Sequence, residues 1–316
     1  MTPVSVPCRD LAWCCPDDPP DEVLAFDDQV EGGLPIGAPG KVGVLDLTLS
    51  THGGRTRVER QYQRAPLYIY RPVYLDPARP DMAFLFVQQS GDGFVQGDRN
   101  RVDVHCGPGS AAHITTQAAT KVFAARQNYA CHVVNLRADA GTVLEYLPDA
   151  TVPFRGSRFF QRTRVIANPE STVILGETVL PGRVARGEKH LYDFYWAETE
   201  VQDDSGQLLF SDVLRICPAA GQGPNSLAVL GDYDVVTAVY ILSRQTNPTN
   251  MVELLRAALA GCSGVLSGVS ELPNGCGVAL RLLGPTSLTV QAALTTAWTA
   301  ARLELLGAPP PDLRKG

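Results

Sequence analysis

Short segments rich in β-branched and aromatic residues follow one another along most of this chain, and this pattern limits its fold more than any other feature. The segment at residues 42–49 alternates apolar and polar residues over its second half, as a half-buried strand does. Most segments are separated by Gly, Pro, Asp or Asn at intervals of about ten residues, which is typical of all-β proteins. Few helical periods interrupt them before residue 250, so the sequence predicts a mainly β fold and disfavours a βαβ fold. Further segments of this kind lie at residues 67–71, 83–88, 101–105, 111–116, 132–136, 142–147, 162–166, 171–178 and 191–201.

Two α-helices are predicted towards the C-terminus. Apolar residues recur at helical spacing from Met251 to Leu259 and again from Val290 to Leu305, and Gly307 is placed to end the second helix. Such stripes usually pack against a core. A helix near a chain end can also dock a partner protein, so both helices are candidate partner-binding elements.

Composition excludes some classes of function. The chain has 316 residues, a formal net charge of -6 and a pI of about 5.4, which argues against a nucleic-acid-binding protein with its basic footprint. No apolar run reaches the roughly 18 residues that a membrane span needs. The N-terminus lacks a basic stretch followed by an apolar one, so we predict no secretory signal and expect a cytoplasmic location.

The sequence suggests three parts. Residues 1–37 are acidic and rich in turn-forming residues, and we expect a poorly ordered extension. Residues 38–309 are expected to form a single β-rich domain, and residues 310–316 a flexible tail. Cys14 and Cys15 in the extension are a weak candidate for metal binding. The cysteines elsewhere show no C-x-x-C spacing and are expected to be reduced and mostly buried.

Polar motifs are densest between residues 90 and 190, and the first two precede residue 124. In "GDGFVQGDR", Asp98 follows Gly97 and either caps a turn or points a carboxylate into a cleft. In "HITTQAATKVF", residues 113–123, the small side chains before Lys121 either form an ordinary sheet face or leave room for another surface or a channel near the backbone.

Two more polar motifs follow. "VLEYLPDATVPFRGSRFFQRTRV", residues 143–165, is either a solvated basic edge strand or an arginine set paired with buried acids such as Glu145. "GETVLPGRVARGEKH", residues 176–190, places Glu177, Arg183 and Glu188 around a Pro-Gly turn. It forms either a surface loop of ion pairs or a polar gate on a route for a cation.

Histidine spacing does not indicate a metal cage. The five histidines show neither an H-x-H nor an H-x₃-H pattern. The pairs His105–Cys106 and Cys131–His132 could form a site only if facing strands brought them together. His113 is a weaker candidate ligand in the second polar motif.

Taken in series, these motifs resemble the urease accessory protein D family, UreD, called UreH in some bacteria. The resemblance rests on "GFVQGDR", "ITTQAATKVF", "LEYLPDATVPFRGSRF" and "GETVLPGRVARGE" in this order, and extends from about residue 38 to residue 306. Gln96 stands where the family commonly has glycine. The resemblance implies a helix-like stack of β-sheets, either β-helical or two-layered. It also implies a non-enzymatic scaffold that binds apo-urease and UreF, which carries the GTPase UreG.

The family resemblance further implies delivery of nickel to the urease active site through an internal polar tunnel, with no tightly bound cofactor. Carboxylates and one histidine would hold Ni²⁺ in transit, since nickel accepts imidazole and tolerates oxygen donors. Weak binding suits transport, because a deep site would trap the ion. The candidate transient ligands are Asp98, Glu145, Glu177, Glu188 and His113. The candidates that line or gate the tunnel are Thr116, Gln117, Thr120, Lys121 and Arg183, and we expect Lys121 to pair with an acid.

Two other functions stay open from the sequence. A β-stack carbohydrate hydrolase could use Asp98 and Glu177 as an acid/base pair. Only 7% of the residues are aromatic, which disfavours a sugar-binding cleft. A purely adhesive β-protein without an ion route is the third possibility.

Overall fold

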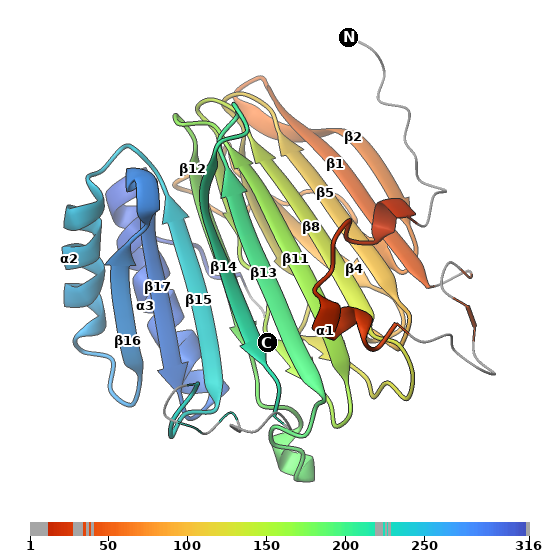
Figure 1. Ribbon diagram of the computed structural model, residues 1–316. Coiled ribbons are helices and arrows are strands. Elements are labelled where there is room, and N and C mark those ends of the chain that lie inside the picture. Colours follow the sequence, from red (N-terminus) through yellow and green to blue (C-terminus); the bar gives the residue numbers. More distant parts are fainter. Residues whose placement is uncertain are drawn as a thin grey trace.

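Two β-sheets packed face to face form the body of the protein (Figure 1). This computed structural model describes residues 12–27, 34–35, 38, 41–218, 224, 226 and 229–313. The prediction of a mainly β fold with long helices towards the C-terminus is confirmed.

The seven-stranded sheet has the order β14-β13-β11-β8-β5-β1-β2. Its five central strands pair in parallel, and an antiparallel strand lies at each edge. Its strands are β1 (Val42–His52), β2 (Arg55–Arg64), β5 (Arg99–Cys106), β8 (Ala130–Ala138), β11 (Arg158–Ala167), β13 (Phe194–Gln202) and β14 (Leu208–Ile216).

The ten-stranded sheet has the order β16-β17-β15-β12-β9-β6-β4-β3, and the short strands β7 and β10 pair beside β12. Its central strands β4, β6, β9 and β12 are parallel. Its strands are β3 (Leu67–Tyr68), β4 (Ala83–Gln89), β6 (Ala111–Thr116), β7 (Thr120–Val122), β9 (Val143–Tyr146), β10 (Thr151–Pro153), β12 (Thr172–Val179), β15 (Val235–Leu242), β16 (Leu266–Glu271) and β17 (Gly277–Gly284).

The chain crosses from one sheet to the other at almost every step from β4 to β13. Strands β5, β8, β11 and β13 join the seven-stranded sheet, and β4, β6, β9 and β12 join the ten-stranded sheet between them. Each pair of successive strands is one coil, and each coil hydrogen-bonds to the next in parallel register. This arrangement is the helix-like stack of sheets that the family resemblance implied.

The main core fills the space between the two sheets. Leu45, Leu47 and Val102 come from one sheet and Leu85 and Ile114 from the other, and all are almost completely buried. Residues of opposite parity on each strand face outwards, since side chains alternate across a strand. The sandwich therefore has an inner space and two outer faces. The position of a polar residue in its strand decides whether its side chain points into the inner space or onto an outer face.

Helices α2 (Pro248–Leu259) and α3 (Ser287–Leu306) cover the outer face of the ten-stranded sheet around β15–β17 (Figure 1). Asn247 accepts a hydrogen bond from the Thr249 amide at 2.8 Å and caps α2, and Thr286 caps α3 in the same way. Gly307 ends α3 with φ of 67°, as predicted. β15 is buried along its whole length, because the helices cover one of its faces and the other sheet covers the opposite one.

Part of the N-terminal extension packs onto the sandwich. The 3₁₀-helix η1 (Ala12–Cys14) and the short helix α1 (Asp21–Leu24) lie on the outer face of the seven-stranded sheet (Figure 1). Cys14 and Val23 are almost fully buried there. Residues 12–27 thus pack against the sheet, and the poor order expected of the extension stays a prediction. Residues 1–11 lie outside the described residues, and the boundaries of the domain and of the tail stay predictions.

Gly277 at the start of β17 should be intolerant of any side chain. Its φ is +150°, and a Cβ there would lie 2.0 Å from the Ile241 carbonyl oxygen of β15. We expect Gly277→Ala to lower the free energy of unfolding by about 2 kcal/mol or more in urea titrations. Gly268→Ala on the neighbouring β16 is the matched control, because no atom of the described residues lies within 4 Å of a Cβ at that position. Equal effects of the two changes would contradict this prediction.

Candidate functional site

Glu177 is the central polar residue between the two sheets. It lies near the end of β12, and its inward parity points it towards the seven-stranded sheet, where the Tyr195 hydroxyl of β13 donates a hydrogen bond to its carboxylate. Glu177 is half-buried in an otherwise apolar interior. A carboxylate in such a place must find a partner on the opposite sheet or bind a proton.

A second acid lies close to Glu177 at the same end of the sandwich. Asp212 of β14 accepts hydrogen bonds from the Tyr240 hydroxyl of β15 and from the Arg281 guanidinium of β17. The charges of Asp212 and Arg281 both act on Glu177. We call these five residues the inter-sheet cluster: Glu177, Tyr195, Asp212, Tyr240 and Arg281. The side chains of Asp212 and Arg281 are 31% and 36% exposed, so the cluster reaches solvent.

Burial raises the pKa of Glu177 to about 7, although the Tyr195 hydroxyl and the Arg281 charge act in the opposite direction. The carboxyl is therefore divided between its neutral and charged forms near neutral pH. Burial and the charge of Glu177 together hold the pKa of Tyr195 well above its usual value, so this hydroxyl stays a donor.

The motif "TTQAATK" lines a cavity of about 150 Å³ elsewhere between the two sheets. Thr116, Gln117, Thr120 and Lys121 all belong to its wall, so the structure brings together four of the predicted tunnel-lining residues. Lys121 pairs with Asp92 at 2.5 Å, which identifies the acid that we expected but could not name.

Two residues of the cavity wall extend deeper between the sheets. His132 of β8 faces inwards, its Nε2 atom is buried with no hydrogen-bond partner among the described residues, and burial lowers its pKa to about 4. Tyr146 of β9 also lines the cavity, and burial and the charge of Glu177 raise its pKa. Tyr146 thus lies between the cavity and Glu177, and polar side chains follow one another across the sandwich interior.

Glu145 and His113 lie on the opposite side of the ten-stranded sheet. Both are completely buried beneath α3, with His113 Nδ1 2.7 Å from Glu145 Oε2. Arg302 of α3 donates to both Glu145 oxygens at 3.2–3.3 Å and also pairs with the buried Asp76. Trp298 of α3 stacks on His113 and donates to Glu145 at 3.2 Å.

We call Glu145, His113, Arg302 and Asp76 the buried ionic group. Its contacts join α3 to the sheet, so its role is structural. Burial raises the pKa of Glu145, but the hydrogen bond from His113 and the charge of Arg302 outweigh it and hold this pKa below the usual range. The carboxylate is therefore charged and already satisfied. Of the five predicted nickel ligands, only Glu145 and His113 are in contact with each other, and their contact fixes α3 to the sheet.

Asp98 lies at the turn before β5. Its Oδ2 accepts a hydrogen bond from the Val95 amide at 2.8 Å, and its Oδ1 is 3.3 Å from Lys41 Nζ. Burial raises the pKa of Asp98, and the Val95 amide and Lys41 act against this rise. Asp98 therefore caps its turn, which is one of the two roles that the sequence left open for it. Glu177 lies in the other sheet and pairs with Tyr195, so these contacts do not favour the acid/base pair of the hydrolase hypothesis.

Glu188 and Arg183 form a bidentate ion pair at 2.6–2.8 Å in the loop around η2 (Val184–Arg186). Arg183 also lies over the Phe154 ring at 4.0 Å. Both side chains belong to a partly exposed loop. Their contacts are those of a surface loop of ion pairs, which is one of the two alternatives that the sequence left open.

The predicted metal ligands are distributed over four places rather than one. Within the described part of the chain, no group of three or more His, Cys, Asp or Glu side chains could hold a metal ion. In the register of β5 and β8, Cys131 pairs with Arg99 and Cys106 pairs with Ala138, so the two Cys-His pairs lie at opposite ends of these strands and do not converge.

Sequence reasoning missed the partners of the two buried carboxylates. Arg302 carried a signal, because a single charge one turn after Trp298 within the apolar stripe of a helix indicates a buried ion pair. Tyr195, Asp212, Tyr240 and Arg281 carried none. The packing of the two sheets brings Tyr195 and Asp212 to Glu177, and the pairing of β12, β15 and β17 within one sheet brings Tyr240 and Arg281 there.

Comparison with known proteins gives a consistent result. The family model described as UreD urease accessory protein matches residues 41–315. A protein named urease accessory protein UreD 2 from Streptomyces griseus is 42% identical over 283 residues, covering 89% of this chain and 96% of that protein. Urease accessory protein UreD from Cenarchaeum symbiosum is 34% identical over 284 residues, covering 90% and 99%, and that from Haloarcula marismortui is 35% identical over 280 residues, covering 89% and 92%. Among the described helices, none has the length and apolarity required to span a membrane.

Glu177 should make the stability of the protein depend on pH. Its folded-state pKa of about 7 lies above the usual 4.5, so the folded state binds the extra proton and the free energy of unfolding should fall as pH rises from 5 to 8. In Glu177→Gln, we expect this fall in the free energy of unfolding between pH 5 and pH 8 to be smaller by up to about 3 kcal/mol. Urea titrations at the two pH values would measure it. Glu188→Gln is the control, and an unchanged pH dependence in Glu177→Gln would contradict the assignment.

Arg302 should be essential for the docking of α3. Arg302→Met leaves Glu145 and Asp76 buried without their cation, and we expect a loss of about 3–5 kcal/mol in the free energy of unfolding. Arg137→Met on the outer face of β8 is the control, because its pairing with Asp139 is largely exposed and should contribute less than about 1 kcal/mol. Comparable losses in the two variants would show that the buried ionic group is not what holds the helix.

Proposed function

Because the chain belongs to the UreD family of urease accessory proteins, we propose that it is a non-catalytic scaffold in urease maturation that helps deliver nickel to the urease active site. The row of polar side chains across an apolar interior carries this proposal. A protein that needed only stability would gain little from a half-buried carboxyl with a raised pKa at this place.

The nickel route that we propose runs from the cavity wall of Thr116, Thr120 and Lys121, past Tyr146, to Glu177 and the solvent-facing end of the inter-sheet cluster. Hydroxyls and a carboxyl that is only partly ionised are weak ligands for a divalent cation. Weak binding at successive positions allows an ion to enter and to leave, as transport requires. Nickel is the cargo of this route and not a resident cofactor.

Glu177 is the ligand that we favour among the five candidates. His113, Trp298 and Arg302 already engage the Glu145 carboxylate beneath α3, so nickel would have to break the contacts that hold the helix. Asp98 caps its turn, and Glu188 is engaged with Arg183. These four residues would shape the protein around the route, and Glu177 would meet the ion.

The partners in this proposal are apo-urease and UreF, with UreG joining through UreF in the cytoplasm. The outward side of α3 is the surface that we favour for UreF, since its Leu288 and Leu303 side chains are 82% and 51% exposed. Exposed apolar side chains on a helix that is otherwise well packed suit a helical partner.

Reconstituted urease activation tests the proposal. The chain would be co-expressed with the urease subunits and the remaining accessory proteins, and the nickel content of the purified urease and its urea hydrolysis would be measured. We expect Glu177→Ala to lower both severalfold while the accessory complex still assembles, because the route loses its carboxyl. Glu188→Ala, in the partly exposed loop around η2, should leave both near the wild-type level.

Two results would contradict the proposal at different levels. Full nickel loading by Glu177→Ala within an intact complex would refute the route through the inter-sheet cluster. Failure of the wild-type chain to bind either apo-urease or UreF would refute the scaffold function itself.

A further inference from the structure

An acidic segment of the chain lies on the outer face of the seven-stranded sheet. This segment, residues 12–27, contains Asp17, Asp18, Asp21, Glu22 and Asp27 and no basic residue. It precedes the residues that match the UreD family model, which begin at residue 41. The strands beneath it present arginine side chains, so charge complementarity is the first feature of this contact.

Three of these arginines are held in place by carboxylates of the sheet. The Nε atoms of Arg101, Arg158 and Arg162 each donate to a carboxylate at 2.7 Å, and their partners are Asp103, Asp193 and Glu198, respectively. Their terminal nitrogens and flat faces remain turned outwards. A guanidinium that is oriented in advance loses less side-chain entropy when it binds a ligand.

The outward groups of Arg101 and Arg162 receive the first half of the acidic segment. Arg101 lies over the Trp13 ring at 4.0 Å and donates to the Trp13 carbonyl at 2.5 Å. Arg162 donates to the side chain of Asp18 at 2.5 Å and to its carbonyl at 2.9 Å. Arg164 adds a contact to Asp17 at 3.3 Å.

Aromatic side chains hold the second half of the segment. Arg158 lies over the Phe26 ring at 4.5 Å, and Phe26 packs against Phe194 at 5.2 Å between ring centroids. Val23 is buried in a cluster with Phe160 and Trp196 of the sheet. The surface thus binds acidic side chains with its arginines, and it binds apolar side chains with an aromatic patch.

Side chains of the sheet, and no strand-like pairing, attach the segment. Among the described residues, the backbone–backbone hydrogen bonds of residues 12–27 all stay within the segment itself. It could therefore leave the sheet without breaking any strand ladder, as a bound peptide does.

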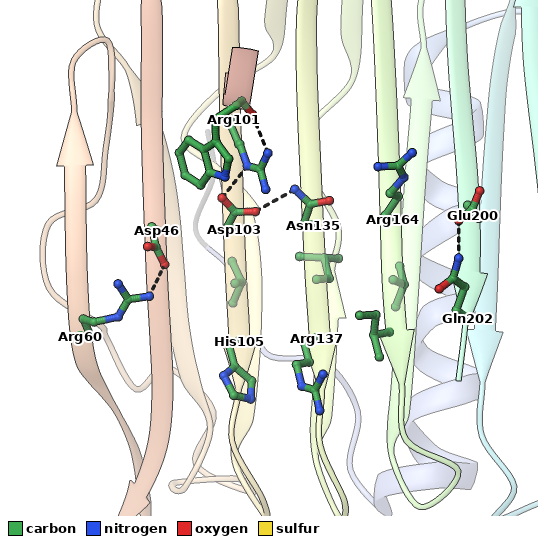
Figure 2. A pocket seen from close by; sticks show the side chains of 15 residues that line it. Asp46, Arg60, Arg101, Asp103, His105, Asn135, Arg137, Arg164, Glu200 and Gln202 are labelled. Carbon is green, nitrogen blue, oxygen red and sulfur yellow. Dashed lines mark hydrogen bonds and ion pairs between the residues drawn. The ribbon is translucent and has the colours of Figure 1, made fainter. Parts of the chain in front are cut away.

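The same face has unfilled space on both sides of the segment. A groove of about 580 Å³ extends from Trp13 across the outward side chains of β5, β8, β11 and β13. Figure 2 shows Arg101, Asp103, Asn135, Arg137 and Arg164 rising from neighbouring strands into this groove. A second hollow of about 310 Å³ lies beside Phe26, Phe194 and Trp196. A longer ligand than residues 12–27 would fit on this face.

We infer that the outer face of the seven-stranded sheet is a docking surface for an acidic, aromatic-containing peptide segment of a partner protein, and that residues 12–27 occupy this surface within the same chain. The inference rests on the proposed function, because such a partner would belong to the urease maturation assembly. The partner segment competes with residues 12–27, whose covalent attachment gives them a high effective concentration. Docking therefore requires a partner segment that fills more of the face than residues 12–27 do.

Competition by a synthetic peptide of residues 12–27 tests the inference. Its binding, with a fluorophore at its N-terminus and its cysteines kept reduced, would be measured by fluorescence anisotropy against the full-length chain and the double variant Asp17→Lys, Asp18→Lys. The variant removes at least two ion pairs of the attached competitor, so we expect it to bind the peptide about tenfold more tightly than the wild type does. Adding Arg162→Gln and Arg164→Gln to this variant should abolish the gain.

A matched control separates this effect from a change in net charge. Asp232→Lys with Glu253→Lys makes the same charge change at two exposed positions away from the surface, and should leave peptide binding at the wild-type level. Equal binding by the wild type, the Asp17→Lys, Asp18→Lys variant and the control, with all three shown to be folded by their urea midpoints, would overturn the inference. Urease activation by the wild-type chain is measured separately, so the proposed function can fail while the peptide titration still decides whether the docking surface exists.

Discussion

The alternation of the chain between two sheets is the constraint on which the rest of the structure depends. Each coil of the stack places one strand in each sheet, so the inward side chains of the two sheets face one another. Inward apolar side chains pack against one another and form the core. An inward polar residue must find its partner on the opposite sheet, and Glu177 does so with Tyr195 of β13. The polar row across the interior exists because several coils supply such residues at one level.

The ten-stranded sheet shows how a second set of charges is stabilised on an outer face. Glu145 is one residue before Tyr146 on β9, so it points away from the interior and would be solvated if α3 were absent. Arg302, His113 and Trp298 replace that water completely. Two carboxylates that look equivalent in the sequence therefore have opposite properties: the pKa of Glu145 is lowered by its partners, and that of Glu177 is raised by burial.

The fold was largely predictable because its signals are local. Strand periodicity, turn residues and the two apolar helical stripes identified the mainly β body and both long helices, and the family motifs indicated the stack. The cavity wall of Thr116, Gln117, Thr120 and Lys121 was also predictable, since these residues are adjacent in the chain. The partners of Glu177 were not, because Asp212, Tyr240 and Arg281 are far from it in sequence. Asp212 meets it through the packing of the two sheets, and Tyr240 and Arg281 meet it through strand pairing within one sheet. The contacts of residues 12–27 were missed for a similar reason, since their arginine partners lie on strands nearly a hundred residues or more away.

Strand alternation also separates the two activities that we propose for this protein. On β8, Cys131 faces the segment bound to the outer surface, while His132 faces the cavity between the sheets. On β11, Arg162 reaches outwards to Asp18, and its neighbours in the strand point into the sandwich. One layer of sheet therefore has a recognition surface on one side and a polar passage on the other. Substitutions on the two sides should act independently, because their side chains share a backbone but no partners. A scaffold built this way can change its partner specificity through outward residues while the interior that would carry nickel stays the same.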